Sequence, residues 1–315
     1  MATINLFVSG IDMPKGDYLR PGIQLTEVSP GVWYSFSQTG EINILKGKLT
    51  FSSSGIWVDG FITDIIIQNK LGLPTIEFQN IYFDASINNY LSKVNPVSDR
   101  QWLGLRVLTS GNDLINGSKG DDILYGGDGN NTFDGSTGID KVWYPGNRED
   151  YQISYQLKSF QLQRTDGFDV IKNVERLVFQ NANIAIDISD KGLGDGNAGT
   201  VAKVLGAVFG KSSLANKSYV GIGLSYVDKG MSYSDLASLA LNAAGSTTPD
   251  QIVTTLWTNV IGSAPSTADK APFIQMLASG TKVGDLAVMA ADTSFNATNI
   301  NLTGLAQTGI EYTPA

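Results

Sequence analysis

The sequence contains no cysteine and no histidine. Without cysteine there is no disulfide, no thiol nucleophile, no zinc ribbon and no iron–sulfur cluster. Without histidine the usual zinc and haem ligands are missing, and so is the usual general base of a serine or cysteine hydrolase. The metal ligands that remain are oxygen atoms of Asp, Glu and Asn side chains and of backbone carbonyls, which suit Ca²⁺ and Mg²⁺. We therefore do not expect an enzyme.

Positive charge and long apolar runs are also scarce. The chain has 22 Lys+Arg against 30 Asp+Glu and a formal net charge of −8, which argues against a nucleic-acid-binding surface. Its most apolar stretch, residues 61–67, includes Asp64 and is too short to span a bilayer. Residues 1–7 lack the basic segment and the long apolar core of a cleaved secretory signal. We expect a soluble protein with no transmembrane segment, whose export signal, if it has one, lies elsewhere in the chain.

Three parts of the chain differ in pattern. The 315 residues, of which 42% are hydrophobic, are enough for two or three domains with packed cores. Residues 1–103 alternate short β-branched and aromatic runs with Gly and Pro, which is typical of an antiparallel β-sandwich or barrel. Residues 104–190 carry a repeat and further strands. Residues 191–315 take on a helical period, with Val201 and Val208 on one predicted face. We predict a mainly β, multi-domain chain with an α-helical C-terminal domain.

Two patterns mark helix positions in the C-terminal part. Residues 248–251, Thr-Pro-Asp-Gln, have the chemistry of a helix N-cap followed by Pro in the first turn and Gln three residues after the cap. They predict a helix that runs towards Gly262. Residues 230–240 align with residues 280–290 at an offset of 50, and five of the eleven positions are identical. This alignment indicates either a duplicated helical unit or two helix starts of similar chemistry.

Residues 108–143 repeat one pattern every nine residues. The turns are Leu108–Asn116, Gly117–Tyr125, Gly126–Asp134 and Gly135–Trp143. The fourth position is always glycine, the sixth is Asp or Asn, and the eighth is a large apolar residue. In chain order these positions hold Gly111, Gly120, Gly129 and Gly138; then Asp113, Asp122, Asn131 and Asp140; then Ile115, Leu124, Phe133 and Val142. Residues 108–140 contain six Asp and one Lys, which indicates a cation as the partner.

This pattern resembles the RTX nonapeptide repeat G-G-x-G-x-D-x-U-x, in which U is a large apolar residue. The resemblance implies a parallel β-roll, in which six residues of each turn form a glycine-rich loop and three form a short strand with the eighth residue pointing inward. Successive strands then lie in two stacked sheets. A Ca²⁺ ion would bridge the loops of alternate turns. Asp113 and Asn131 would share one site, and Asp122 and Asp140 would share another.

We expect the ions to be held by oxygen atoms at the third, fifth and sixth positions of the loops. These residues are Ser110, Asn112, Asp113, Lys119, Asp121, Asp122, Asp128, Asn130, Asn131, Thr137, Ile139 and Asp140. Asn131 stands where the repeat usually has Asp, which weakens the first site. Residues 108–110 lack the glycine pair, so the first turn is expected to form only in part. We therefore expect two well-formed ion sites, and a third ion is left open.

Two other interpretations of this segment fit less well. A Gly/Asp-rich linker would not place large apolar residues nine apart over four turns. An EF-hand needs a twelve-residue loop that ends in Glu and is followed by a helix, and the sequence provides neither.

The resemblance extends past the repeat. Residues 144–151 and 166–179 are similar to the β segment that often follows RTX repeats, and this similarity implies a cap over the strand edges at the end of the roll. We interpret Glu175 and Arg176 in this segment as a capping ion pair or a solvated face.

RTX proteins are typically exported by type I secretion with an uncleaved C-terminal signal. The resemblance therefore implies an extracellular or cell-surface protein whose signal lies in residues 296–315. Calcium is scarce in the cytosol and abundant outside the cell, so calcium binding would supply folding free energy only after export.

We expect a calcium-binding structural protein that assembles with itself as a surface-layer, biofilm-matrix or filament subunit. The alternative is an adhesin or carbohydrate-binding module in residues 1–103, with Trp33, Trp57 or Tyr82 against cell-surface glycans. A secreted hydrolase is less favoured, because the hydrolases that accompany RTX repeats use histidine.

Overall fold

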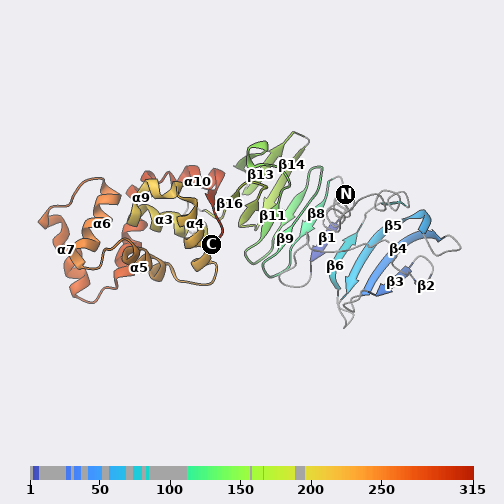
Figure 1. The fold of residues 1–315 in the computed structure, drawn as a ribbon, viewed down its shortest axis with the longest axis horizontal. Helices are drawn as coiled ribbons and strands as arrows, with labels where there is room; N and C mark the ends of the chain where they lie inside the picture. Colours follow the sequence, from blue (N-terminus) through green and yellow to red (C-terminus); the bar gives the residue numbers. More distant parts are fainter. Residues whose placement is uncertain are drawn as a thin grey trace. The chain divides into compact units, whose positions relative to one another are not determined.

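The computed structural model describes residues 112–156, 158–165, 167–188 and 196–315, together with the backbone of seven strands between residues 3 and 84. The chain divides into two compact units, Met1–Val174 and Glu175–Ala315. The first unit is built from strands and the second is mainly helical (Figure 1). The predicted change from β structure to helices along the chain is confirmed.

The strands between residues 3 and 84 pair antiparallel with one another. They are β1 (Thr3–Leu6), β2 (Thr26–Ser29), β3 (Val32–Phe36), β4 (Ile42–Phe51), β5 (Trp57–Gln68), β6 (Pro74–Gln79) and β7 (Phe83–Asp84). Their order across the sheet is β1-β6-β5-β4-β3-β2, with β7 paired to β5. The antiparallel pairing agrees with the prediction for residues 1–103, whereas closure into a sandwich or barrel stays a prediction.

The nonapeptide turns form the strands of a parallel roll. These strands are β8 (Leu114–Asn116), β9 (Ile123–Leu124), β10 (Thr132–Asp134) and β11 (Lys141–Trp143). Strand β8 pairs parallel with β10, so that Ile115 lies opposite Phe133. Strand β9 pairs parallel with β11, so that Leu124 lies opposite Val142. All four of these side chains are fully buried. Alternate turns therefore lie in different sheets, as the resemblance implied.

Further strands lie on both sides of the β8–β10 pair. Those after the repeat are β12 (Gln152–Gln156), β13 (Ser159–Arg164) and β14 (Gly167–Lys172). Strand β14 pairs parallel with β10, and β13 and β12 extend the sheet antiparallel from it. On the other side, β1 pairs parallel with β8. The predicted cap thus exists for this sheet, and it covers the edge of β10 with backbone hydrogen bonds.

The second unit contains eight α-helices and three strands that pair antiparallel among the residues that the structure describes. The helices are α3 (Asn197–Phe209), α4 (Lys217–Val227), α5 (Tyr233–Ala243), α6 (Pro249–Ile261), α7 (Thr267–Ala278), α8 (Val283–Ala291), α9 (Ser294–Asn299) and α10 (Leu302–Thr308). The strands are β15 (Arg176–Val178), β16 (Asn183–Ala185) and β17 (Ile310–Tyr312).

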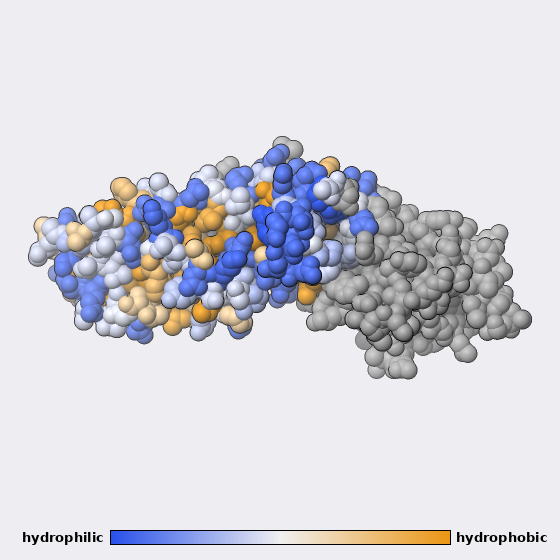
Figure 2. Space-filling model, turned by 45° about the horizontal axis from the view of Figure 1, so that its top comes forward, coloured by the Kyte–Doolittle hydropathy of each residue, from blue (hydrophilic) through white to orange (hydrophobic). Residues whose placement is uncertain are grey.

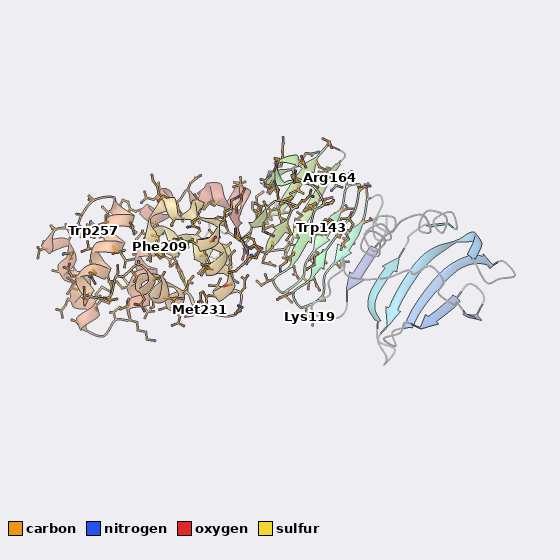
Figure 3. The ribbon with its side chains drawn as sticks, in the orientation of Figure 1. Lys119, Trp143, Arg164, Phe209, Met231 and Trp257 are labelled. Atoms are coloured by element: carbon orange, nitrogen blue, oxygen red, sulfur yellow. The ribbon has the colours of Figure 1, made fainter. Side chains whose placement is uncertain are left out.

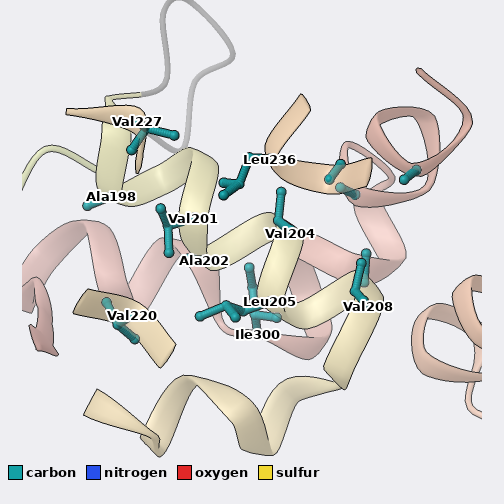
Figure 4. Packing of buried hydrophobic residues seen from close by; sticks show 14 of the residues in the cluster. Ala198, Val201, Ala202, Val204, Leu205, Val208, Val220, Val227, Leu236 and Ile300 are labelled. Atoms are coloured by element: carbon teal, nitrogen blue, oxygen red, sulfur yellow. The ribbon is translucent and has the colours of Figure 1, made fainter. Parts of the chain in front are cut away.

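Helix α3 lies at the centre of the helical core. Ten of its thirteen residues are buried, which is typical of a helix that is surrounded by others. Val220 of α4, Leu236 of α5, Leu256 of α6 and Leu286 of α8 belong to the same buried cluster (Figure 4). The apolar face predicted for this helix therefore packs into a core that most of the other helices share.

Helix α6 begins and ends as the sequence predicted. The Thr248 hydroxyl accepts a hydrogen bond from the Gln251 backbone N–H at 3.3 Å, and the Gln251 side chain accepts one from the Thr248 N–H at 3.0 Å. Gly262 ends the helix in the left-handed region with φ 87°. The predicted capping box and C-terminal glycine are both confirmed.

The fifty-residue offset appears in the structure as two equivalent helix pairs, α4–α5 and α7–α8. The link in each pair contains a glycine with positive φ, Gly230 at 90° and Gly280 at 98°. Helices α5 and α8 also contact each other, since the Ser234 hydroxyl donates to Asp285 Oδ1 at 2.6 Å. Both interpretations of the alignment, a duplicated unit and two similar helix starts, agree with this arrangement.

The structure differs from the prediction for Arg176. Its side chain is buried, and it donates to Asp187 Oδ1 at 2.6 Å and to Asp228 Oδ1 at 2.7 Å. Its hydrogen bond to Glu175 is to the backbone carbonyl oxygen, at 2.9 Å. The interpretation of Arg176 as part of a solvated face or of a capping pair with Glu175 is wrong. A buried guanidinium needs compensating carboxylates, and its two partners come from distant positions in the sequence.

The helical unit has an apolar pocket on its surface. The pocket has a volume of about 200 Å³, and its lining includes Phe209, Tyr219, Ile222, Tyr226 and Leu239. Figure 2 shows apolar residues gathered over this part of the molecule. None of the helices within the described ranges has the length and hydropathy that crossing a membrane requires.

Candidate metal centre

The residues at the sixth position of each turn are buried where the loop meets the strand. Asp113, Asp122, Asn131 and Asp140 are exposed by only 2%, 1%, 1% and 0%, respectively. A buried carboxylate is costly unless hydrogen-bond donors or a cation compensate its charge. The burial of three such carboxylates within 28 residues is thus the first structural sign of a cation site.

Hydrogen bonds join these residues in pairs 18 residues apart. The Asp113 N–H donates to Asn131 Oδ1 at 3.0 Å, and the Asp122 N–H donates to Asp140 Oδ1 at 2.8 Å. The Asp122 carboxylate also accepts from the N–H of Ser118 at 2.6 Å and from its hydroxyl. The structure therefore brings together the two pairs that the sequence assigned to shared sites.

The residues at the fifth position hold the same loops in register. Asn112 Oδ1 accepts from the Asn130 N–H at 2.9 Å, and Asp121 Oδ1 accepts from the Ile139 N–H at 2.8 Å. The loops of the second and fourth turns are joined again, since the Thr137 hydroxyl donates to the backbone carbonyl of Lys119 at 3.1 Å. These bonds hold the loops of alternate turns side by side in register.

The remaining predicted ligands lie on the outside of the loops. The side chains of Lys119, Asp128 and Thr137 are exposed, so their predicted part is limited to backbone carbonyl oxygens. Figure 3 shows Lys119, from the loop of the second turn, on the opposite side of the roll from Arg164, which contacts the loop of the third turn. The two sets of loops therefore lie on opposite sides.

Some predicted residues lie outside the part that the structure describes. These are Ser110 and Tyr82, together with the side chains of Trp33 and Trp57. The completeness of the first turn and the glycan-binding face therefore stay predictions.

Glycine is required at the first loop position because alternate turns lie in close contact. A Cβ atom on Gly117 would lie 2.4 Å from the carbonyl oxygen of Gly135 and 3.0 Å from Asp122 Oδ2. A Cβ atom on Gly135 would lie 2.0 Å from the carbonyl oxygen of Asn173 and 2.6 Å from Asp140 Oδ2. The space beside each buried carboxylate is thus small and bounded by oxygen atoms.

These surroundings fit a hard cation. No group of three or more acidic, His or Cys side chains that could hold a metal is found in the described residues, so an ion here would be held by two side chains and by backbone carbonyls. Such oxygen ligands suit Ca²⁺. The pair of Asp113 and Asn131 offers one carboxylate, and the Asn131 amide nitrogen is buried with no acceptor among the described atoms. That the first site is the weaker one stays a prediction.

Asp169 extends the series and was not predicted from the sequence. It is fully buried in β14, and its Oδ1 accepts from the Asn131 N–H at 2.8 Å, as Asn131 itself accepts from Asp113. Burial raises the pKa of the Asp169 carboxyl, and Arg164 opposes this increase. Residues 167–172, Gly-Phe-Asp-Val-Ile-Lys, repeat the fourth to ninth positions of a turn, and this pattern could have identified Asp169.

The comparisons with known proteins agree with this geometry. Residues 108–142 match the family model of the RTX calcium-binding nonapeptide repeat, which consists of four copies. No curated protein matches the chain. The turns are therefore RTX repeats, calcium is the ion that such repeats bind, and proteins that carry them are typically secreted.

Proposed function

We propose that this RTX-repeat protein is an extracellular structural subunit whose roll folds when calcium binds between alternate turns. The observation that carries the calcium part is the buried pair of Asp122 and Asp140. The Asp140 carboxylate accepts a hydrogen bond from the backbone N–H of Asp122, and the carboxylates of both residues are buried away from water. Two buried carboxylates on stacked loops repel each other, which disfavours the stacked state. The stacked state is therefore expected to be stable only when a cation is bound between them.

Linkage converts this site into a folding switch. Calcium bound only by stacked loops stabilises the folded roll by RT ln(1 + [Ca²⁺]/Kd), which is about 0.4 kcal/mol per ion when calcium equals Kd and about 1.4 kcal/mol at a tenfold excess. Extracellular calcium modules have Kd values on the order of 10⁻⁴–10⁻³ M, which matches calcium levels outside the cell and far exceeds cytosolic levels. The roll is therefore expected to remain unfolded until export.

Two matched substitutions test the ion site. Asp140→Asn keeps an oxygen acceptor for the Asp122 N–H and removes one charge, so we expect calcium affinity at this site to fall at least about tenfold. Asp128→Asn removes the charge of an exposed loop carboxylate and leaves its backbone carbonyl in place, so affinity is expected to stay within about twofold. Calorimetric titration of both full-length variants with calcium gives the comparison. Equal affinity and stoichiometry in the two variants would overturn the proposed site.

The proposed role in assembly is supported by what surrounds the roll. The chain lacks cysteine and histidine, only 17% of its residues are charged, and the helical unit exposes large apolar side chains. Tyr219 and Ile222 on α4 are 43% and 47% exposed, beside the apolar pocket. Exposed apolar side chains that gather around one pocket are typical of an interaction surface. We propose a surface-layer, matrix or filament subunit rather than an enzyme.

Adding millimolar calcium to purified monomer tests assembly. We expect light scattering to rise and ordered polymers to appear by electron microscopy, and chelator to prevent both. A protein that stays monomeric at every protein and calcium concentration contradicts the assembly role, whereas the calcium site is decided by the titration alone.

The proposed export route uses the C-terminal end of the chain. We propose type I secretion without a cleaved N-terminal signal, with residues 296–315 as the signal. The test is to fuse residues 191–315 to a reporter in a host with a type I transporter. Export of the fusion is expected, and retention inside the cell would contradict this route.

A further inference from the structure

Strand β14 adds one more, shortened turn to one side of the roll. Val170 lies opposite Thr132 and Ile171 opposite Phe133, the same register in which β10 follows β8. The Phe168 N–H donates to Asn130 Oδ1 at 2.8 Å, as the Asn130 N–H donates to Asn112 Oδ1. Asp113, Asn131 and Asp169 therefore form one column at the sixth position. We call each contact between neighbouring members of this column a step: the first joins Asp113 to Asn131, and the second joins Asn131 to Asp169.

The second step of this column contains a positively charged side chain. Arg164 Nη1 donates to Asp169 Oδ2 at 2.8 Å, and Arg164 Nη2 donates to the backbone carbonyl oxygen of Gly129. Both side chains are shielded from water, with 9% of Arg164 and 0% of Asp169 exposed. One guanidinium thus joins a sixth-position carboxylate to a fourth-position carbonyl of the turn before it.

The other side of the roll repeats the same frame between its second and fourth turns. The Asp122 N–H donates to Asp140 Oδ1 at 2.8 Å, as the Asn131 N–H donates to Asp169 Oδ1. The residue that corresponds to Gly129 is Gly120. Its neighbour Lys119 has an exposed side chain that lies outside the loop.

We propose that the Arg164 guanidinium takes the place of a calcium ion between the third turn and β14, and so ends the series of ions with a cation that belongs to the chain. This inference rests on the proposed calcium sites. The charges agree with it: Asp122 and Asp140 together match one divalent cation, whereas Asn131 and Asp169 carry one carboxylate and match one guanidinium. The contact between the third turn and β14 therefore forms without calcium. It gives the roll a preformed end on which the ion-dependent turns stack.

Counting bound calcium ions in full-length variants tests the proposal. Asp169→Asn keeps an oxygen for the Asn131 N–H and removes the charge that Arg164 balances. We expect this variant to bind as many ions as the wild type, because no ion is bound at this step. A loss of one ion per chain would show that Asp169 is a calcium ligand and would overturn the proposal.

Arg164→Ala gives the complementary result. Removing the guanidinium leaves the carboxylate and the carbonyl without their cation, so we expect one additional calcium per chain. The melting temperature should then fall much more in chelator than in millimolar calcium. An unchanged ion count with an equal fall in both media would overturn the proposal, because an ordinary ion pair predicts that result. If this variant does not fold, the ion count of Asp169→Asn decides.

Two controls separate this inference from the proposed function. Arg148→Ala removes another arginine of the same segment, whose Nη1 donates to the Tyr151 carbonyl oxygen at 2.7 Å, and should leave the ion count unchanged. An additional ion in this control would overturn the specific role of Arg164.

The second control is Asp140→Asn, which should lower the affinity for one ion. Suppose that the wild type binds calcium and that Asp140→Asn lowers the affinity for one ion. If the ion counts of Arg164→Ala and Asp169→Asn then differ from those expected, only the proposed role of Arg164 is refuted. A wild type that binds no calcium refutes both proposals.

Discussion

The roll and the helical unit are stabilised in different ways. The turns of the roll bury few large apolar side chains, one at the eighth position of each turn and Tyr125 in the second, and their strands are two or three residues long. The helical unit buries a continuous apolar cluster around α3, and several of its helices begin with side-chain caps. Burial of one large apolar side chain contributes only about 1.5–3 kcal/mol. We therefore expect the turns to need cations between their loops and the helices to fold without them.

Removal of calcium should separate the two regions and have the largest effect. In chelator we expect the roll to unfold, because its buried carboxylates lose their cation, while the helical unit keeps its structure. Limited proteolysis with mass spectrometry should then find cleavage within the turns, residues 112–143, while residues 175–188 and 196–315 stay protected. Loss of both regions at the same chelator concentration would break the comparison.

The next largest effect is expected inside the helical unit and should not depend on calcium. Arg176→Ala leaves the carboxylates of Asp187 and Asp228 without the guanidinium that they share, which should cost about 3–5 kcal/mol of unfolding free energy. Urea unfolding in calcium and in chelator checks this value. Lys217→Ala, which removes an exposed ion pair with Glu311, is the control and should cost at most about 1 kcal/mol. A calcium-dependent effect of Arg176→Ala would be inconsistent with an independent helical unit.

A pair of glycine substitutions compares crowding in the roll with open space among the helices. Gly135→Ala places a Cβ atom against a backbone oxygen, so we expect a loss of about 1–3 kcal/mol and a weaker response to calcium. In Gly230→Ala the new Cβ atom meets no atom within 4 Å, and the only cost is the strain of a non-glycine residue at φ 90°. We expect a loss of about 1–2 kcal/mol of unfolding free energy and no change in calcium response. Thermal melting at several calcium concentrations measures both. A calcium response that Gly135→Ala leaves unchanged would argue against the close stacking of turns.

The smallest expected effect is a pH-dependent cap at the start of α7. Hydrogen bonds from the hydroxyl and N–H of Ser266 lower the pKa of the Asp269 carboxyl. A lowered folded-state pKa means that the ionised carboxylate stabilises the fold at neutral pH, and that this stabilisation is lost as the pH falls through the folded pKa. The melting temperature of Asp269→Asn should therefore lie slightly below that of the wild type at neutral pH and converge with it in acid. A difference that does not vary with pH would exclude the carboxylate as the cause.

The features that the sequence could predict are those that short-range patterns determine. The nine-residue period placed Ile115 and Phe133 on facing strands and paired Asp122 with Asp140. Cap chemistry at Thr248 predicted the start of helix α6. The fifty-residue offset predicted that helices α5 and α8 begin in a similar way. In each case the interacting groups lie within a few residues or at a fixed spacing.

The features that the sequence could not predict depend on long-range contacts. Asp169 was missed although residues 167–172 carry part of the repeat pattern, because it lies 38 residues beyond Asn131 and the β12–β13 hairpin interrupts the nine-residue period before it. Arg176 looked like a surface residue because Asp228, one of its two partners, lies 52 residues away. The parallel pairing of β1 with β8 leaves no local pattern at all. A single sequence indicates which residues are charged but not which distant partner compensates a buried charge.

The central claim is that a calcium ion lies between alternate turns, and diffraction from crystals grown in millimolar calcium tests it most directly. We predict anomalous density between the loops of residues 117–122 and 135–140, within ligand distance of the Asp122 and Asp140 carboxylates and of backbone carbonyl oxygens. Ordered loops in the same stacked arrangement, with no such density at saturating calcium, would contradict the account.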